Sequence, residues 1–213
     1  IITGGDAADT IVGNAGADSI TGGAGDDIIT GGDGTDTFNV DSGTDIVNDL
    51  GGSSGGENDI VIISAGATVN ANNIVSFVAT SATQNNSTDA GNAVLTAKSG
   101  AGRTISVANA TGSSKAFTLV GSDGNDLLTG GAGDDIISVT SAGHANADIL
   151  DGGAGTDTLV LSSGTHTLTS ENKIVNIENI NPVSYTHLRA HETREDRVCP
   201  VGLGKKKGGG GGG

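Results

Sequence analysis

The sequence predicts an all-β solenoid, a chain wound into flattened coils whose parallel strands stack coil upon coil. One observation is a nine-residue repeat with glycine, aspartate and a large apolar residue at fixed positions. Another is composition: 38 of the 213 residues are glycine, β-branched residues are common, and no stretch has the Ala, Leu, Glu and Lys content of a long helix. Residues 1–182 hold three Phe and no Trp or Tyr. So thin an apolar core suits a solenoid, because each coil is stabilised mainly by its neighbours.

The repeat follows the template G-G-x-G-x-D-x-U-x, where U is a large apolar residue. Its copies start at Gly4, Gly13, Gly22, Gly31, Val40, Gly121, Gly130, Gly143 and Gly152. The sixth position is always aspartate: Asp9, Asp18, Asp27, Asp36, Asp45, Asp126, Asp135, Asp148 and Asp157. The eighth is always apolar: Ile11, Ile20, Ile29, Phe38, Val47, Leu128, Ile137, Leu150 and Leu159. A column that never varies marks a true structural period.

Each unit divides into a glycine-rich turn of six residues and a strand of three, because glycine tolerates the backbone angles of so tight a turn. Position eight then faces the core, and positions seven and nine face outward. If two units make one coil, each strand lies on the strand eighteen residues later, and each aspartate lies beside the aspartate two copies on. Paired carboxylates repel one another unless a cation lies between them. Calcium suits such a site, because it accepts six to eight oxygens, including backbone carbonyls, at about 2.4 Å.

These copies resemble the repeats-in-toxin (RTX) family of hemolysin-type calcium-binding nonapeptide repeats, and the resemblance implies a parallel β-roll that binds Ca²⁺. Carried over residue by residue, it pairs Asp9 with Asp27, Asp18 with Asp36, Asp27 with Asp45, Asp126 with Asp148, and Asp135 with Asp157. In the best-formed turns it adds Gly22, Gly25, Gly31, Gly34, Gly130, Gly133, Gly152 and Gly155 to the metal site. Asp26 and Asp134, at position five, are expected to face solvent.

The repeat divides the chain into segments. Residues 1–50 form a first RTX β-roll block, residues 51–120 a β-rich spacer, residues 121–160 a second block, and residues 161–182 a truncated β segment. In the spacer, strands are expected at 60–63, 74–78, 94–97, 104–107 and 117–120. The spacer ends in a degenerate copy, residues 112–120, which has Phe117 in place of aspartate and resembles a cap without a metal site. Residues 183–213 resemble a translated sequencing adapter, and we expect a non-native, disordered read-through tail.

Charge narrows the choice of partners. Residues 1–182 hold 22 Asp and Glu against 4 Lys and Arg, a net charge of −18, which repels nucleic acid and anionic membranes. The same residues lack cysteine, so oxygen ligands are the available cross-link. No apolar run is long enough to span a bilayer. The expected partners are therefore calcium ions and neighbouring repeat modules of a parent chain, with a cell-surface or matrix partner left open.

The sequence offers no catalytic constellation. Ser53 and Ser54 fit a G-x-S-x-G pattern by letter but lie in a glycine-serine linker, and His144 and His166 have no zinc-like spacing. The chain opens inside a repeat and holds no Met, so we expect a fragment. The resemblance implies a secreted bacterial protein, exported by type I secretion and folding on extracellular calcium. Two alternatives stay open: an accessory region of a secreted protease, lipase or epimerase, or a module of an adhesin or surface-layer protein.

Overall fold

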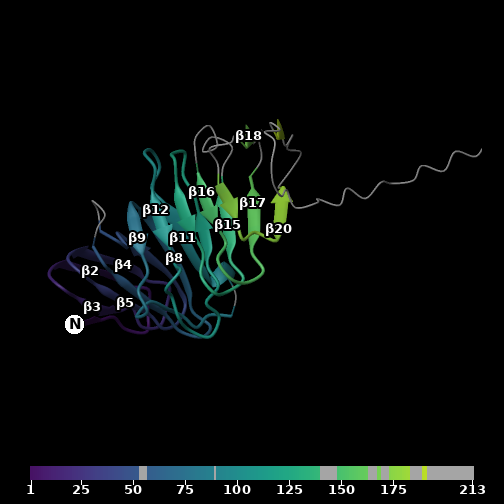
Figure 1. Ribbon diagram of the computed structural model, residues 1–213. Helices are drawn as coiled ribbons and strands as arrows, with labels where there is room; N and C mark the ends of the chain where they lie inside the picture. The colour runs from purple at the N-terminus through teal and green to yellow at the C-terminus, as the bar shows by residue number, and fades with distance from the viewer. Residues whose placement is uncertain are drawn as a thin grey trace, which may run out of the picture.

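The computed structural model describes residues 1–52, 57–88, 90–139, 148–162, 167–168, 173–182 and 189–190. Within these ranges every strand pairing is parallel, and the only helical element is a 3₁₀ turn, η1 (Ala90–Asn92). Figure 1 shows the strands following one another along a single axis, from purple at the N-terminus to yellow-green at β20. The predicted parallel β-solenoid is confirmed.

Three sheets form the walls of the solenoid. The long sheet contains β2 (Thr10–Ala15), β4 (Ile28–Asp33), β6 (Thr44–Asn48), β8 (Thr68–Ile74), β11 (Ala93–Ala97), β13 (Thr118–Val120), β15 (Ile136–Val139), β17 (Thr158–Leu161) and β20 (Asn179–Pro182). The N-terminal sheet contains β1 (Ile2–Thr3), β3 (Ser19–Thr21), β5 (Thr37–Val40), β7 (Ile60–Ile63) and β10 (Gln84–Asn85). The C-terminal sheet contains β9 (Ser76–Val78), β12 (Thr104–Ser106), β14 (Leu127–Thr129), β16 (Ile149–Asp151) and β19 (Lys173–Val175). A separate pair joins β18 (Thr167–Leu168) to β21 (Arg189–Ala190).

The coils change shape along the axis. In the first block the chain alternates between the long sheet and the N-terminal sheet, so each coil has two sides. Between β8 and β11 the chain visits all three sheets in turn, through β9 and β10, so this coil has three sides. In the second block the chain alternates between the long sheet and the C-terminal sheet. The long sheet is therefore one continuous wall through both blocks and the spacer.

Strand register follows the predicted coil length in the first block. Ile11 pairs with Ile29 and Ile29 with Val47, each eighteen residues later. In the spacer the step is longer, since Val47 pairs with Ala71 and Ala71 with Leu95, each 24 residues later. In the step from Ala71 to Leu95 the chain passes through β9 and β10, and the extra residues supply a third side of the coil. The step from Val47 to Ala71 passes through β7 alone.

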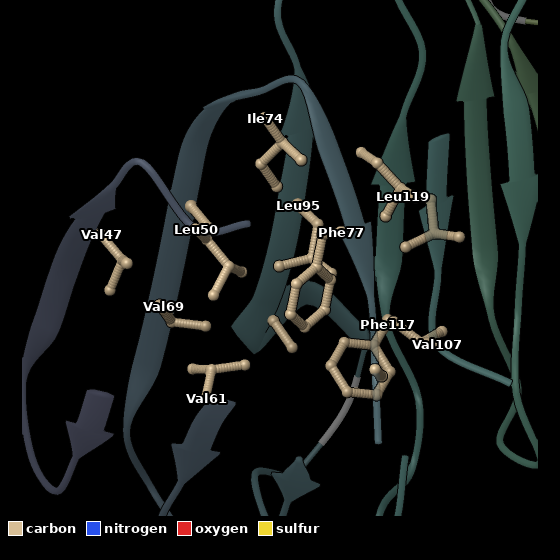
Figure 2. Packing of buried hydrophobic residues seen from close by; sticks show 14 of the residues in the cluster. Val47, Leu50, Val61, Val69, Ile74, Phe77, Leu95, Val107, Phe117 and Leu119 are labelled. Carbon is tan, nitrogen blue, oxygen red and sulfur yellow. The ribbon is translucent and has the colours of Figure 1, made fainter. Parts of the chain in front are cut away.

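The core is the space enclosed by these walls. The side chains at position eight of all nine copies are buried, with exposed fractions of 8% or less. The three phenylalanines, Phe38, Phe77 and Phe117, are the largest fully buried side chains. The core is thus mostly aliphatic, with an aromatic ring at three inward positions. Figure 2 shows Phe77 and Phe117 among aliphatic side chains in the middle of the solenoid.

Spacer strands form close to the predicted positions, with three differences, one of which is the short strand β10, which was not expected. The single strand expected at 74–78 is divided at the corner residue Val75, so that β8 and β9 lie in different sheets. The polar stretch Thr68–Asn73 also joins the long sheet, which the sequence reasoning missed. Ser53, Ser54, His144 and His166 lie outside the described residues, as does the predicted tail except for Arg189–Ala190.

Candidate metal-binding turns

The predicted metal-binding aspartates lie at the corners of the coils, at or next to the start of a strand. Asp9 and Asp18 are half-buried. The other seven are buried, with exposed fractions of 3% or less: Asp27, Asp36, Asp45, Asp126, Asp135, Asp148 and Asp157. Aspartate is seldom buried without a partner, because removing a carboxylate from water is costly. Seven buried copies therefore require a compensating interaction.

The structure brings every predicted aspartate pair together. In each pair the backbone N–H of the earlier aspartate donates to Oδ1 of the later one. The donor–acceptor distances are 2.8 Å for Asp9–Asp27, 2.9 Å for Asp18–Asp36, 3.1 Å for Asp27–Asp45, 2.9 Å for Asp126–Asp148 and 2.7 Å for Asp135–Asp157. The two pairs separated by 22 residues have the same contact as the pairs separated by 18. We call each such column of linked carboxylates an acidic ladder.

The surroundings of the second carboxylate oxygen place seven of the nine aspartates in two groups. In Asp9, Asp126 and Asp135, Oδ2 accepts an N–H from the residue four positions earlier in its own turn, at 2.6 to 2.7 Å. Four other Oδ2 atoms are buried and have no hydrogen-bond partner among the described residues, those of Asp27, Asp36, Asp45 and Asp157. A buried acceptor that lacks a partner carries its full desolvation cost. A cation at these oxygens would remove that cost.

The glycines of the turns leave room for carboxylate oxygens and for backbone carbonyl oxygens. A Cβ on Gly22 or Gly31 would lie 2.2 Å from Oδ2 of the aspartate five residues later. A Cβ on Gly34 would lie 2.4 Å from the carbonyl oxygen of Gly16 in the preceding coil, and Gly34 also has a positive φ of 130°. The turns therefore place carbonyl and carboxylate oxygens next to one another, which is the ligand set of a hard cation.

The remaining predicted glycines occupy equivalent places. Gly130 and Gly152 would each bring a Cβ to 2.5 Å from Oδ2 of their own aspartate, and a Cβ on Gly155 would lie 2.2 Å from the carbonyl oxygen of Gly133. A Cβ on Gly25 or Gly133 would meet the backbone of the preceding coil, at 2.7 Å and 2.4 Å. Both blocks are thus built from the same close contact between successive turns.

The acidic ladders disfavour their own ionisation. The pKa of Asp135 is raised to about 7 and the pKa of Asp45 to about 6; burial is the first cause, and the neighbouring carboxylates Asp157 and Asp27 contribute. Burial also raises the pKa of Asp36 and of Asp157. Backbone N–H donors oppose these shifts without cancelling them. A bound divalent cation would reverse the effect, because it favours the ionised carboxylate.

The structure adds two carboxylates that the sequence reasoning missed. Asp36 donates its N–H to Oδ1 of Asp59 at 2.8 Å, and Asp157 donates its N–H to Oε2 of Glu178 at 2.8 Å. Burial raises the pKa of Asp59 to about 6. Asp59-Ile60-Val61 repeats positions six to eight of the template, so a search for this tripeptide alone would have found Asp59.

Two further acidic residues hold the turn that precedes Asp36. Asp49 accepts the N–H groups of Gly31 and Gly32 at 3.1 and 3.0 Å, and Glu57 accepts the N–H of Gly34 at 3.2 Å. Burial raises the pKa of Asp49. These carboxylates accept amide donors of the turn and so hold it against the following coil.

Asp26 and Asp134 are exposed, as expected. Each accepts a backbone N–H from the next coil, from Thr44 and Thr156 respectively, at 2.8 Å. They connect successive turns from the solvent side and stand apart from the buried ladders.

Carboxylates alone do not complete a metal site here. Among the described residues, no group of three or more His, Cys, Asp and Glu side chains converges in a way that could hold a metal ion. The ligands must therefore combine carboxylates with the turn carbonyls. No helix in the described ranges is long and apolar enough to cross a membrane.

Comparison with known families agrees with this geometry. The RTX calcium-binding nonapeptide repeat family matches the chain four times, over residues 3–38, 12–47, 118–139 and 140–165. These ranges include all nine predicted aspartates and exclude Asp59 and Glu178. Searches of curated proteins and of solved structures found no significant match. Residues 3–47 and 118–165 therefore carry RTX calcium-binding nonapeptide repeats, wound into a parallel β-roll.

Proposed function

We propose that calcium ions bind between successive glycine turns at the acidic ladders and hold the coils together. The observation that carries this assignment is the set of buried, unpartnered Oδ2 atoms of Asp27, Asp36, Asp45 and Asp157. Their partners in each ladder, and the carbonyls of the glycine turns, complete the ligand set. The role is binding coupled to folding: without a cation the ladders are repulsive, and with one they become cross-links.

Asp26 and Asp27 provide a matched test, because they are adjacent in one turn and only Asp27 is buried. Asp27→Asn keeps the side-chain size and removes one charge from a two-carboxylate site. We expect it to weaken calcium binding at that site by about tenfold or more, measured by isothermal titration calorimetry with calcium. Asp26→Asn should leave the affinity within about twofold. Equal losses in the two variants would show that the aspartates act only as a diffuse negative field.

We further propose that the chain is part of a secreted protein that folds outside the cell. Its support is the net charge of −18 over residues 1–182, which disfavours the compact state until cations bind. Extracellular calcium sites have dissociation constants of about 0.1 to 1 mM. We expect the coil-to-β transition, followed by far-UV circular dichroism, to have its midpoint in that range with calcium and no transition with magnesium at the same concentration. A midpoint below about 1 µM would contradict folding triggered by export, because the site would already fill in the cytosol.

Among the open alternatives, an extended surface array has one structural feature in its favour. The long sheet runs without a break through both blocks and the spacer, so further coils could stack on the same axis. Extension of the gene sequence distinguishes the alternatives: additional coils would support the array, and a catalytic domain would support the accessory role in a secreted enzyme.

A further inference from the structure

The middle of the solenoid differs in charge from the two blocks beside it. Residues 60–120, called the central section below, contain one acidic residue, Asp89, and three basic residues, Lys98, Arg103 and Lys115, for a net charge of +2. Residues 1–59 contain 12 acidic and no basic residues, and residues 121–182 contain nine acidic and one basic. The self-repulsion that opposes folding of the blocks is therefore absent from the central section.

The acidic ladder of the long sheet is replaced by apolar side chains in the central section. Asp45 pairs with Val69, and Val69 pairs with Ala93. Phe117 occupies the next place, because it precedes Thr118, which pairs with Val94. Val69, Ala93 and Phe117 are all completely buried. Phe117 also donates its N–H to Oδ1 of Asp135 at 2.6 Å, so an apolar residue begins the ladder of the second block. No cation is needed where there is no carboxylate.

The central section also has a continuous apolar core. It includes Val61, Ile74, Phe77, Leu95, Val107 and Leu119, and Figure 2 shows these side chains in the space between the strands. Every one of them is 1% exposed or less. Burial of apolar surface is the main favourable term in folding, and it does not depend on calcium.

A basic side chain holds the turn that joins β11 to β12. Arg103 takes the place in the column of Asp126, because Thr104 pairs with Leu127. The Arg103 guanidinium donates to the carbonyl oxygens of Lys98 at 2.9 Å and Ser99 at 3.1 Å, and its backbone N–H donates to Oδ1 of Asp126 at 2.7 Å. A covalently attached cation thus binds the carbonyls of this turn, the task assigned to calcium in the blocks.

Neutral groups also make contacts between coils at β10. The buried amide of Asn85 donates to the carbonyl oxygen of Ala116, and its Oδ1 accepts the N–H of Ser87 at 2.9 Å. The carbonyl oxygen of Asn85 accepts the N–H of Ser114 at 3.2 Å. These contacts connect two coils without charge.

We propose that the central section folds and stays folded without calcium, and that it is the seed on which both blocks fold when calcium binds. This inference rests on the proposed calcium-dependent folding of the blocks. Both ends of the seed present a strand of the long sheet: β8 to β6 on one side, and β13 to β15 on the other. Each block then adds coils to a preformed edge, which avoids the unfavourable first step of closing an isolated coil.

Hydrogen–deuterium exchange of the full chain, followed by mass spectrometry, tests the seed. In chelator, we expect peptides from residues 60–120 to exchange at least about a hundredfold more slowly than peptides from residues 1–45 and 121–160, because only the seed is folded. With 5 mM calcium, all three regions should be protected. Fast exchange of all three regions in chelator with protection in calcium would overturn the seed and leave calcium-dependent folding standing. Equal protection of all three regions in chelator would overturn both.

Substitutions at Phe117 test whether the central section stays folded without calcium because apolar residues replace the carboxylates there. Phe117→Asp restores a carboxylate at the head of the ladder, and we expect protection of residues 93–120 in chelator to fall at least about tenfold and to return with calcium. Phe117→Leu keeps the position apolar and should retain protection in chelator. If Phe117→Asp is insoluble, Arg103→Gln provides the second test: the second block should need at least about twofold more calcium to fold, while residues 60–97 stay protected in chelator. An unchanged calcium midpoint in Arg103→Gln, or equal protection in the two Phe117 variants, would contradict the proposal.

Discussion

The backbone N–H of Asp36 donates to Oδ1 of Asp59 over 2.8 Å, although 23 residues separate the two. The other aspartate pairs of the first block are eighteen residues apart. The Asp36–Asp59 pair keeps the same contact although five more residues lie between its members. Asp59 also accepts the N–H of Gly51 through Oδ2, at 2.7 Å. The acidic ladder of Asp18 and Asp36, beside the N-terminal sheet, therefore extends to Asp59, beyond the last nonapeptide copy of the first block.

Asp59→Asn tests this extension. The variant should weaken calcium binding at the last site of the first block, because Asp36 Oδ2 would lose the adjacent charge. We expect titration calorimetry to show one weakened site, with affinity lower by about tenfold, and the other sites unchanged. Asp33→Asn, an exposed aspartate in the same turn as Asp36, is the control and should behave as wild type. A normal isotherm for Asp59→Asn would remove Asp59 from the ligand set.

Low pH should partly replace calcium in stabilising the folded chain. The pKa of Asp135 is raised from 3.8 to about 7, and those of Asp45 and Asp59 to about 6, with burial as the first cause. A raised pKa in the folded state means that the folded chain binds more protons than the unfolded chain between these values. The contribution of these three carboxyl groups to stability in chelator is therefore fully present below about pH 4 and is lost as the pH rises through 6 to 7.

Urea denaturation in chelator at pH 4.5, 6 and 7.5, followed by circular dichroism, measures this slope. The midpoint should fall as pH rises, and Asp135→Asn should reduce the slope between pH 6 and 7.5. In calcium the slope should reverse, because the metal needs deprotonated ligands. A midpoint in chelator that rises with pH would show that the ladder carboxylates are stabilised as anions by the fold itself.

Alanine substitutions at Gly34 and Gly16 distinguish the cost of backbone strain from the cost of a steric clash. Both have positive φ values, 130° and 122°, but a Cβ on Gly16 would meet nothing within 4 Å, whereas one on Gly34 would lie 2.4 Å from the Gly16 carbonyl oxygen. Gly16→Ala should cost about 1 to 3 kcal/mol from strain alone. Gly34→Ala should cost more and should also weaken calcium binding, because the turn carbonyl is displaced. Urea denaturation in calcium measures the free energy of unfolding of both variants. Equal losses of stability would mean that the positive φ accounts for the whole cost and that the close contact at Gly34 adds nothing.

Leu127 and Leu128 are neighbours on opposite faces of β14. Leu128 is completely buried at position eight, whereas Leu127 is 37% exposed at position seven. Leu128→Ala should lower the free energy of unfolding in calcium by about 2 to 5 kcal/mol, and Leu127→Ala by less than about 1 kcal/mol. The reverse order would mean that the register of the second block is shifted by one residue.

The nonapeptide period made the first block predictable in detail, because an aspartate such as Asp27 and an apolar residue such as Ile29 each have an equivalent eighteen residues earlier and later in the chain. Glu178 was missed because it departs from the aspartate of the template. The strand through Asn70 and Asn72 was missed because asparagine is uncommon in strands, and the burial of Val69 and Ala71 depends on neighbouring coils. The sheet order of the spacer could not be predicted, since an apolar run such as residues 74–78 does not reveal that the chain turns a corner at Val75.

Coil length varies along the solenoid, yet most strand pairs keep their register; the exception is β8–β11, where the register shifts between Leu95 and Ala97. Ile137 pairs with Leu159 at a step of 22 residues and Leu95 with Leu119 at a step of 24, and in both cases the inward side chains remain aligned. In these two steps the additional residues lie between the paired strands, so the pairing within the sheet is kept. A gene for such a protein can therefore lengthen a corner, or gain and lose a whole turn, without compensating changes in distant codons. Divergence in length is the form of variation that this architecture accepts most readily.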